Sequence, residues 1–441
     1  MSKIEVNTIE PQCGTTLTVG ASGDTITFPT GTTIVNNGTQ TGFGRTGTVD
    51  WDTTIKTSTI TAVSGEGYFV NTSGGAITAN LPAGVVGAIV SFKDYAQTFD
   101  TNALTISANG SEKIEGQTYD LILGTEGQAT TLVYGDATKG WQSVNSNEIT
   151  NIQRFVTATG GTITTVCTNY KVHTFTGPGT FEVTCAGSPA GSSTVSYMVV
   201  AGGGGGGHDD GGGGGAGGYR ESRASDDSYT ASPLNATSGP TYNLSVAASS
   251  FPITVGAGGT GGIPPCNGLQ GSSSIFSTIT SAGGGFGGRS VPTGGPGGSG
   301  GGGGDGVPGG TGNTPPVSPA QGNNGGTGGT ANAAAGGGGA GAVGGNGIPS
   351  PSGGGAGGAG VTTEINASSV TRSGGGGGGG FCAPGAGGAG GGGSGGVYPT
   401  TQATAGTTNT GGGGGGGSTN TGPRDGKNGG SGIVIIRYKF Q

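Results

Sequence analysis

The residues best suited to chemistry in this sequence are two histidines and a few acids. His208, Asp209 and Asp210 are consecutive, and imidazole and carboxylate groups are common metal ligands. Three consecutive side chains do not converge easily on one ion, so we expect a solvated turn and no metal site. The second histidine, His173, alternates within a strand-like run, which predicts a buried or interface position.

Catalytic motifs carry no weight in this glycine-rich background. Segments 297–301 and 392–396 both read Gly-Gly-Ser-Gly-Gly and match the nucleophile-elbow pattern. With 113 glycines in 441 residues, such matches arise from composition alone. Neither histidine stands in a pattern with a nucleophile, and Asp226-Asp227 lie in a polar loop without a framework for glycoside cleavage. The sequence therefore predicts no enzyme and no cofactor.

Composition excludes several other classes. The net charge is −7 with no basic cluster, so nucleic-acid binding is not expected. No apolar run approaches membrane-spanning length and Met1–Val6 lacks a signal-peptide core, so we expect a soluble chain made in a cytoplasm, without membrane insertion. The five cysteines show no metal-ligand spacing. Cys167 and Cys185 flank a predicted hairpin and could approach each other, but free thiols are favoured without secretion.

The dominant feature is the region 201–432, where glycine runs alternate with short inserts. Strand-like segments, Val195–Val200 and Ile433–Phe440, enclose it. Gly/Ser-rich sequence is usually a flexible linker. Here the enclosing strands, β-branched inserts such as 272–280 and the scarcity of charge favour an ordered structure.

A bundle of polyglycine II helices is the ordered structure that such runs can form. This conformation has three residues per turn, a rise of about 3.1 Å per residue and no internal hydrogen bonds. Its N–H and C=O groups must therefore pair with neighbouring helices, which can approach only where residues lack a Cβ. Ordering so much glycine costs much entropy, so many of these bonds must form together.

The remainder of the chain is predicted to be β, which makes the fold class mostly β. Residues 1–45 form a low-complexity segment with strands at Thr16–Val19, Asp24–Phe28 and Thr33–Val35. These strands are too few and short to bury a face alone. We therefore expect them to intertwine with identical chains as the stalk or attachment piece of a homotrimer.

Residues 46–150 are predicted to be a compact β domain of the sandwich or small-barrel type. Trp51 and Trp141, near its two ends, are interpreted as core or interface aromatics. Residues 151–200 supply further strands that lead into the glycine-rich domain, 201–441. The predicted strands are Ile55–Val63, Tyr68–Thr72, Ala76–Leu81, Ala88–Tyr95, Leu104–Ala108, Tyr119–Leu123, Thr130–Tyr134, Phe155–Thr159, Thr162–Val166, Lys171–Phe175 and Thr180–Thr184.

Several segments resemble the glycine-rich domain of tailed-phage tail fibres: Tyr197–Gly207, Ile253–Gly259, Ser274–Gly285 and Gly429–Tyr438. Met1–Ile9 is similar to the N-terminus of marine and cyanobacterial phage fibre proteins. The resemblance implies a virion tail fibre with a polyglycine II tip that binds a host outer-surface receptor, either an outer-membrane protein or a polysaccharide. It also implies that the N-terminus joins a tail or baseplate protein.

The inserts indicate which end of the bundle would meet a receptor. Strand-like inserts largely alternate with short turns rich in Pro, charged or aromatic residues. If each run crosses the bundle once, the short turns gather at the end far from the β domains, and loops on a rigid scaffold concentrate binding residues. The predicted receptor contacts are His208, Asp209, Asp210, Ile263, Pro265, Asn267, Arg289, Pro292, Ile348, Pro349, Phe381, Pro384, Arg424 and Asp425.

The same count makes two further predictions and leaves one segment unassigned. Tyr219, Arg220 and Glu221 end a run on the side of the β domains and should anchor it. Residues 397–410, with Tyr398, fall on that side too. Residues 294–335 do not divide cleanly into crossings.

Three rival functions stay open. A purely structural fibre or virion decoration subunit would need no receptor. An ice-binding protein would need a regular array of small or Thr residues, and the inserts here are too irregular. A carbohydrate-cleaving tailspike would need a groove of clustered carboxylates.

Overall fold

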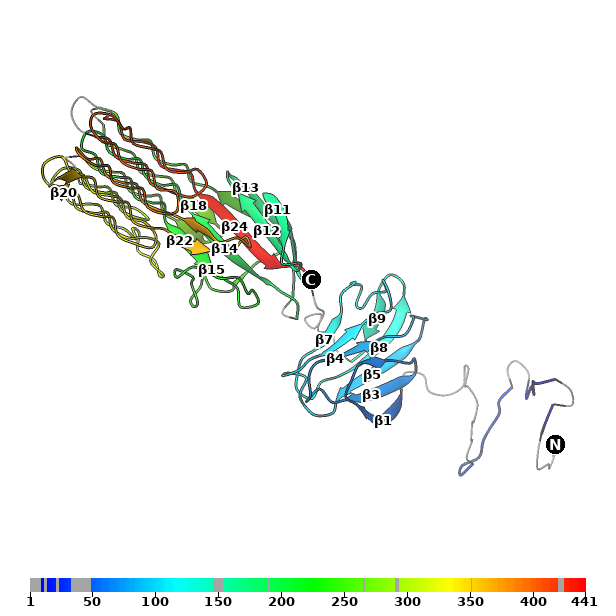
Figure 1. The fold of residues 1–441 in the computed structure, drawn as a ribbon. Coiled ribbons are helices and arrows are strands. Elements are labelled where there is room, and N and C mark those ends of the chain that lie inside the picture. The colour runs from blue at the N-terminus through cyan, green and yellow to red at the C-terminus, as the bar shows by residue number, and fades with distance from the viewer. Residues whose placement is uncertain are drawn as a thin grey trace. The chain divides into compact units, whose positions relative to one another are not determined.

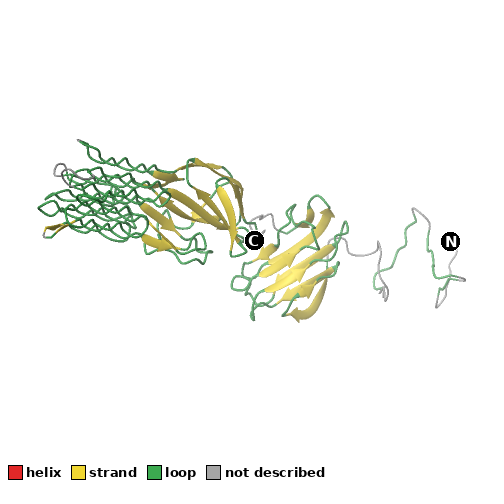
Figure 2. Cartoon of the chain, turned by 45° about the horizontal axis from the view of Figure 1, so that its top comes forward, coloured by secondary structure: helices red, strands yellow, loops and turns green. Residues whose placement is uncertain are grey.

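The protein is mostly β, and its described residues contain no helix (Figure 2). This confirms the coarse fold class. The chain divides into two units, residues 1–49 and 50–441, which are considered separately. The computed structural model describes residues 9–11, 14–20, 24–32, 49–145, 154–188, 190–264, 266–289, 293–349, 351–418 and 424–441.

The described residues of the first unit form no strand. Leu17, Val19, Ile26 and Phe28 alternate with polar residues, yet their side chains are 46% to 60% exposed. The two strands predicted around them are thus not formed, because segments this short bury no face without partner strands. The third predicted strand, Thr33–Val35, lies outside the described residues.

Residues 50–145 fold into two packed sheets (Figure 1). One sheet has the order β1 (Asp50–Lys56), β3 (Glu66–Val70), β5 (Ile89–Asp94), β8 (Ala129–Asp136) and β9 (Gly140–Ser143). The other has the order β2 (Ile60–Thr61), β4 (Ile77–Asn80), β6 (Leu104–Ser107) and β7 (Leu121–Leu123). Because the chain alternates between the sheets, β1, β3 and β5 run parallel, as do β2, β4 and β6. Phe92, Leu104 and Trp141 lie in the shared core.

The first sandwich differs from the predicted strands at two places. The predicted strand Ile55–Val63 is split, because the chain leaves β1 at Lys56 and enters the opposite sheet as β2. The strand β9 is not predicted from the sequence. Its residue Trp141 is fully buried, as a core aromatic should be, whereas Trp51 is 43% exposed and packs on Phe69 with ring centroids 4.8 Å apart.

A second sandwich takes strands from both sides of the glycine runs. Its first sheet has the order β11 (Thr162–Val166), β12 (Tyr170–Phe175), β24 (Ile433–Lys439), β14 (Thr194–Val200) and β15 (Tyr219–Ser222), and β16 (Leu244–Ser245) also pairs with β14. Its second sheet has the order β10 (Val156–Thr159), β13 (Gly179–Ala186), β17 (Ser250–Thr254), β18 (Ser274–Phe276) and β19 (Ile279–Ser281). Phe181, Tyr197, Phe276 and Val434 pack between them.

The closing strand β24 lies in the middle of the first sheet, between β12 and β14 (Figure 1). It is antiparallel to both, with Ile436 opposite His173 on one side and opposite Tyr197 on the other. The strands that precede and follow the glycine region are therefore hydrogen-bonded neighbours. This pairing fixes both ends of the region at one place.

Two short hairpins lie among the glycine runs. The first joins β20 (Ile348–Pro349) to β21 (Ser352–Gly353), and the second joins β22 (Val361–Thr363) to β23 (Val370–Arg372). The second hairpin packs on the sandwich, because Val361 and Ile365 share a core with Met198 and Ile435. The first lies at the opposite end of the runs (Figure 1). We call these the near end and the far end of the bundle.

Hydrogen bonds in the glycine region join different runs, which lie side by side as undulating chains (Figures 1 and 2). Along Gly202–Gly207, successive N–H groups donate to three neighbouring segments in rotation, so that every third residue returns to the same neighbour. The acceptor carbonyls, in chain order, are those of Ser272, Gly430, Gly215, Leu269, Lys427 and Gly212, at 2.8 to 3.0 Å. The carbonyls of the run accept from three more segments, through the N–H groups of Gly284, Gly259, Gly414, Gly287, Gly262 and Gly417.

Side chains are excluded from such a run by the distance to its neighbours. A Cβ built on Gly205 would lie 2.0 Å from the carbonyl oxygen of Thr260, and one on Gly206 would lie 2.1 Å from that of Gly415. Both distances are far below van der Waals contact, and the atoms met are backbone atoms that cannot rotate away. The close approach of the runs therefore requires glycine at these positions.

His173 on β12 links Gly160 and Tyr438 through a chain of buried hydrogen bonds. Its Nδ1 lies 2.8 Å from the Gly160 carbonyl oxygen and its Nε2 lies 3.0 Å from the Tyr438 hydroxyl. The Tyr438 oxygen also accepts the Ala158 N–H, at 3.2 Å. A neutral ring protonated on Nδ1 satisfies all three groups. The prediction of a buried histidine is confirmed, and burial lowers the pKa of His173.

We expect the free energy of unfolding to decrease as the pH falls below about 6.5. The unfolded imidazole titrates near 6.5, whereas burial lowers the folded pKa of His173. The stabilisation is therefore complete above the unfolded pKa and is lost as acid protonates the unfolded chain first. His208 acts with the same sign, because burial lowers its pKa too. Thermal midpoints measured between about pH 7.5 and 5.5 would test this. His173→Gln should reduce the slope, and an identical slope in both proteins would contradict a neutral buried His173.

We expect Gly205→Ala to destabilise the glycine region by about 1–3 kcal/mol, because its Cβ has no room. Urea unfolding of the full chain would measure the change. Gly177→Ala is the matched control, since a Cβ there meets no atom within 4 Å, and it should change stability by less than about 0.5 kcal/mol. Equal effects of the two substitutions would show that the runs are not closely packed.

Candidate functional site

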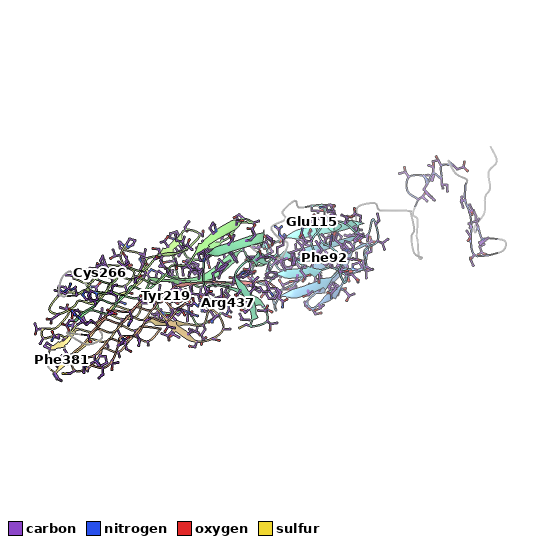
Figure 3. The ribbon with its side chains drawn as sticks, turned by 90° about the horizontal axis from the view of Figure 1, so that it is seen from above. Phe92, Glu115, Tyr219, Cys266, Phe381 and Arg437 are labelled. Carbon is purple, nitrogen blue, oxygen red and sulfur yellow. The ribbon has the colours of Figure 1, made fainter. Side chains whose placement is uncertain are left out.

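Short turns from distant parts of the sequence meet at the far end of the bundle. Figure 3 shows Cys266 and Phe381 at that end, away from Tyr219 at the near end and Arg437 in the sandwich. The far-end turns are joined through their backbones. The Asp209 N–H donates to the Arg424 carbonyl at 2.9 Å, and the Gly354 N–H donates to the Ala383 carbonyl at 2.9 Å.

One part of the far end, the charged corner, consists of His208, Asp209, Cys266 and Arg424. Arg424 Nη2 lies 2.7 Å from Asp209 Oδ2, and this hydrogen bond raises the pKa of Arg424 above its ordinary value. The Arg424 side chain is 42% exposed, so the pair faces solvent. Asp209 and the next residue, Asp210, have φ angles of 52° and 55° in the left-handed region, which acids tolerate better than most side chains.

The prediction of a solvated turn at 208–210 is wrong for His208. It is 1% exposed, and its Nδ1 lies 2.7 Å from the Cys266 carbonyl oxygen. Burial lowers its pKa, against the opposing effect of that hydrogen bond. Its role is to join the turn at 208–210 to the turn at 263–267. The charged groups that remain accessible at this corner are those of Arg424 and Asp209.

A second part of the far end, the aromatic corner, is formed by Phe381 and Tyr398. Their rings are stacked, with centroids 5.2 Å apart and an interplanar angle of 8°. The Gly380 N–H donates to the Gly396 carbonyl at 3.0 Å, which holds the two turns side by side. The predicted near-end position of Tyr398 is therefore wrong. The run 392–396 crosses the bundle, and only the turn at 407–410 lies at the near end, where the Ser373 N–H donates to Thr410.

The other predicted contact residues differ in accessibility. Ile263 and Ile348 are 61% and 55% exposed, and Pro349, Pro384 and Asp425 are exposed as well. Asn267, Asp210 and Arg289 are partly buried. Pro265 and Pro292 lie outside the described residues.

The structure also gives the path of residues 294–335. The Asn332 N–H donates to Asp305 Oδ1 at 3.2 Å, and Gly304 lies against Arg289, so Asp305 belongs to the far end. Gln321 Nε2 donates to the Pro315 carbonyl at 2.8 Å. Its backbone carbonyl accepts the Tyr219 N–H at 2.9 Å, which places Pro315 at the near end.

The near end is held by buried polar residues. Tyr219, Arg220 and Glu221 form β15 and are buried, which confirms their predicted anchoring role. The Glu221 carboxylate accepts the Tyr219 hydroxyl at 2.7 Å and the Ser232 N–H at 3.0 Å. It also accepts the Thr363 hydroxyl of β22. One carboxylate thus connects the sandwich to a hairpin of the bundle.

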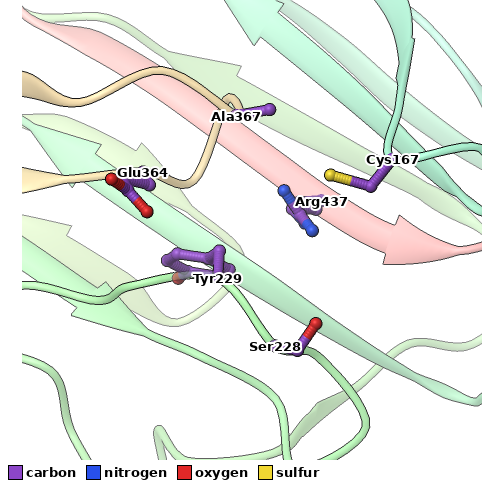
Figure 4. A pocket seen from close by; sticks show the side chains of 6 residues that line it. All are labelled: Cys167, Ser228, Tyr229, Glu364, Ala367 and Arg437. Atoms are coloured by element: carbon purple, nitrogen blue, oxygen red, sulfur yellow. The ribbon is translucent and has the colours of Figure 1, made fainter.

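A pocket of about 270 Å³ lies beside Arg437 on β24 (Figure 4). Arg437 Nε lies 3.0 Å from Asp227 Oδ2, both side chains are 2% exposed, and the guanidinium lies 4.4 Å from the centre of the Tyr170 ring. The Cys167 thiol also lines the pocket, without a histidine among the lining residues. The guanidinium is therefore engaged in holding the fold. The lining residues are Cys167, Ser228, Tyr229, Glu364, Ala367 and Arg437.

The four described cysteines, Cys167, Cys185, Cys266 and Cys382, are free thiols. The described residues contain no cluster of His, Cys, Asp and Glu that could hold a metal ion. Within the same residues no helix is long and apolar enough to cross a membrane.

Residues 174–439 match the family model described as a glycine-rich domain. The match covers more than half of the chain, which therefore belongs to this family of glycine-rich domains. It spans β24 and the runs, and includes both corners of the far end. No curated protein matches the chain.

We expect the Arg424–Asp209 pair to contribute little to the free energy of unfolding, because it is solvent-exposed and screened by salt. A double-mutant cycle with Arg424→Ala and Asp209→Ala, followed by urea unfolding, measures the coupling. The same cycle in high salt should give a smaller value. A large coupling that salt does not reduce would mean that the corner supports the fold rather than presenting charge.

Proposed function

We propose that this chain is a tail fibre protein of a tailed phage, which adsorbs the virion to a host cell through the far end of its glycine-rich domain. Its glycine runs and closing strand resemble those of phage fibres, and the family match covers the same residues. In this proposal the protein is made in the host cytoplasm and works as part of the virion. The receptor is an outer-membrane protein or a polysaccharide.

We propose further that the runs are polyglycine II helices. The support is the return of hydrogen-bond partners at every third residue along Gly202–Gly207, since this helix has three residues per turn. That run has six neighbouring segments, three accepting from it and three donating to it. A threefold helix that carries one donor and one acceptor per residue would produce this pattern.

The observation that carries the receptor proposal is the gathering of chemically varied turns at one end of a bundle whose interior is backbone. Binding residues concentrate on loops held by a rigid scaffold. The far end carries an exposed ion pair at the charged corner and a half-exposed ring at the aromatic corner. The near end is instead occupied by contacts to the sandwich.

The N-terminal segment is proposed to form the trimeric stalk that joins a tail or baseplate protein. The exposed apolar residues Leu17, Val19, Ile26 and Phe28 support it, because alternating apolar side chains need partner strands. Three chains would present three far ends. Weak binding at each would then be strengthened by multivalency.

Exchange of far-end turns tests the receptor proposal. The turns at 263–270, 289–293, 381–384 and 418–427 would be replaced by those of a fibre with a different host range. We expect adsorption to cells to follow the exchanged turns, with the thermal midpoint preserved as evidence of folding. Exchange of the near-end turn at 407–410 is the control and should leave host range unchanged.

Unchanged adsorption after the far-end exchange would contradict the proposal. The receptor would then be bound elsewhere, for which residues 46–150 are the first candidate. If the whole chain proved dispensable for adsorption, the rival function would be favoured, namely a purely structural fibre or decoration subunit.

A further inference from the structure

The aromatic corner combines a fixed geometry with an open surface. Phe381 and Tyr398 stand on different turns, and their parallel stack holds both rings in one orientation. Tyr398 covers one face of the Phe381 ring, yet the Phe381 residue is still 39% exposed. Solvent therefore reaches part of Phe381 despite the stacked Tyr398 ring. A large apolar ring held open at the far end is a preformed contact surface.

The segment that carries both rings is uncharged. Residues 373–423 contain no Asp, Glu, Lys or Arg. The turn that carries Tyr398 continues with Thr400, Thr401 and Gln402, which are exposed. Hydroxyl and amide groups can donate and accept hydrogen bonds without requiring charge on the ligand. The nearest charged residues along the chain are Arg372 and Arg424, and Arg424 is paired with Asp209.

We infer that the aromatic corner binds a neutral hexopyranose, with the C–H face of the sugar ring stacked on Phe381. A pyranose presents apolar C–H groups on one face and hydroxyls around its rim. This matches an exposed ring whose neighbouring turn, paired through Gly380 with Val397 and through Val397 with Thr401, carries Thr and Gln residues. Weak contacts from C–H groups to the ring and hydrogen bonds from the rim would act together. The inference rests on the proposed function and specifies the ligand class for one part of the far end.

The residues of the aromatic corner favour a neutral sugar over an acidic sugar and over an apolar protein loop. A phosphorylated or acidic sugar would need a cation, and none occurs in 373–423. An apolar protein loop would fit the ring but leave the exposed Thr400, Thr401 and Gln402 without a role. Figure 3 places Phe381 and Cys266 at separate positions on the far end, so the charged corner remains available for a second contact.

The test measures binding of the full chain to a panel of neutral trisaccharides, maltotriose, cellotriose, mannotriose and a β-galactotriose, by saturation-transfer NMR. We expect binding of at least one, and about a tenfold loss of affinity in Phe381→Ala, the scale of one lost stacking contact. Phe381→Trp should retain binding. Val343→Ala is the control, because Val343 is 63% exposed and follows a turn at the near end.

Each outcome of this test supports or overturns the sugar-binding inference. Binding of none of the panel, or equal binding by Phe381→Ala and the native chain, overturns the inference. If Phe381→Ala loses adsorption to cells while none of the sugars competes, the corner binds a protein receptor, and only the sugar inference fails. If the sugars bind through Phe381 but far-end exchange leaves adsorption unchanged, the inference stands and the proposed function fails.

Discussion

The hydrogen bond from one glycine run to the next is the interaction on which residues 201–432 depend. Within Gly202–Gly207 each N–H reaches a carbonyl of a neighbouring run, and each carbonyl accepts from another run. A single run gains nothing by becoming ordered, so the runs must form together. The same bonds require interior positions without a Cβ, which is why Gly205 has no space for one. Much of the chemical variety is thereby displaced to the turns, although some side chains, such as Phe286 and Ser299, lie within the runs.

The two ends of the bundle differ in how their polar and aromatic side chains are buried. At the near end, buried Glu221 accepts the Thr363 hydroxyl, and buried Arg437 pairs with Asp227 and donates to the Ile365 carbonyl at 3.3 Å. These contacts tie the hairpin of β22 and β23 to a sandwich in which β24 pairs with β14. At the far end, the Arg424–Asp209 pair and the Phe381 ring are partly exposed. Substitutions at the near end disturb many partners, whereas those at the far end disturb few.

Short apolar and β-branched segments bounded by turn signals are enough to predict most strands, including Thr162–Val166, and a continuous apolar run predicts the closing strand. These local patterns could not show that β1 and β3 are parallel, because pairing depends on distant segments. Counting alternate inserts placed Phe381 at the far end, yet it failed for Tyr398, since the short run 392–396 crosses the bundle without a strand-like insert to mark it. The burial of His208 follows from its contact with Cys266, 58 residues away, which no local pattern reveals.

The threefold rotation of partners along a run also restricts how such genes can change in length. Adding one or two residues within Gly202–Gly207 would point every later N–H at the wrong neighbour. Adding three residues turns every later N–H back towards the same neighbouring segment and, with the rise of the proposed polyglycine II helix, moves the following turn outward by about 9 Å. Insertions and deletions that survive selection inside the runs should therefore occur in units of nine nucleotides, so that arms of different reach can arise without loss of the lattice.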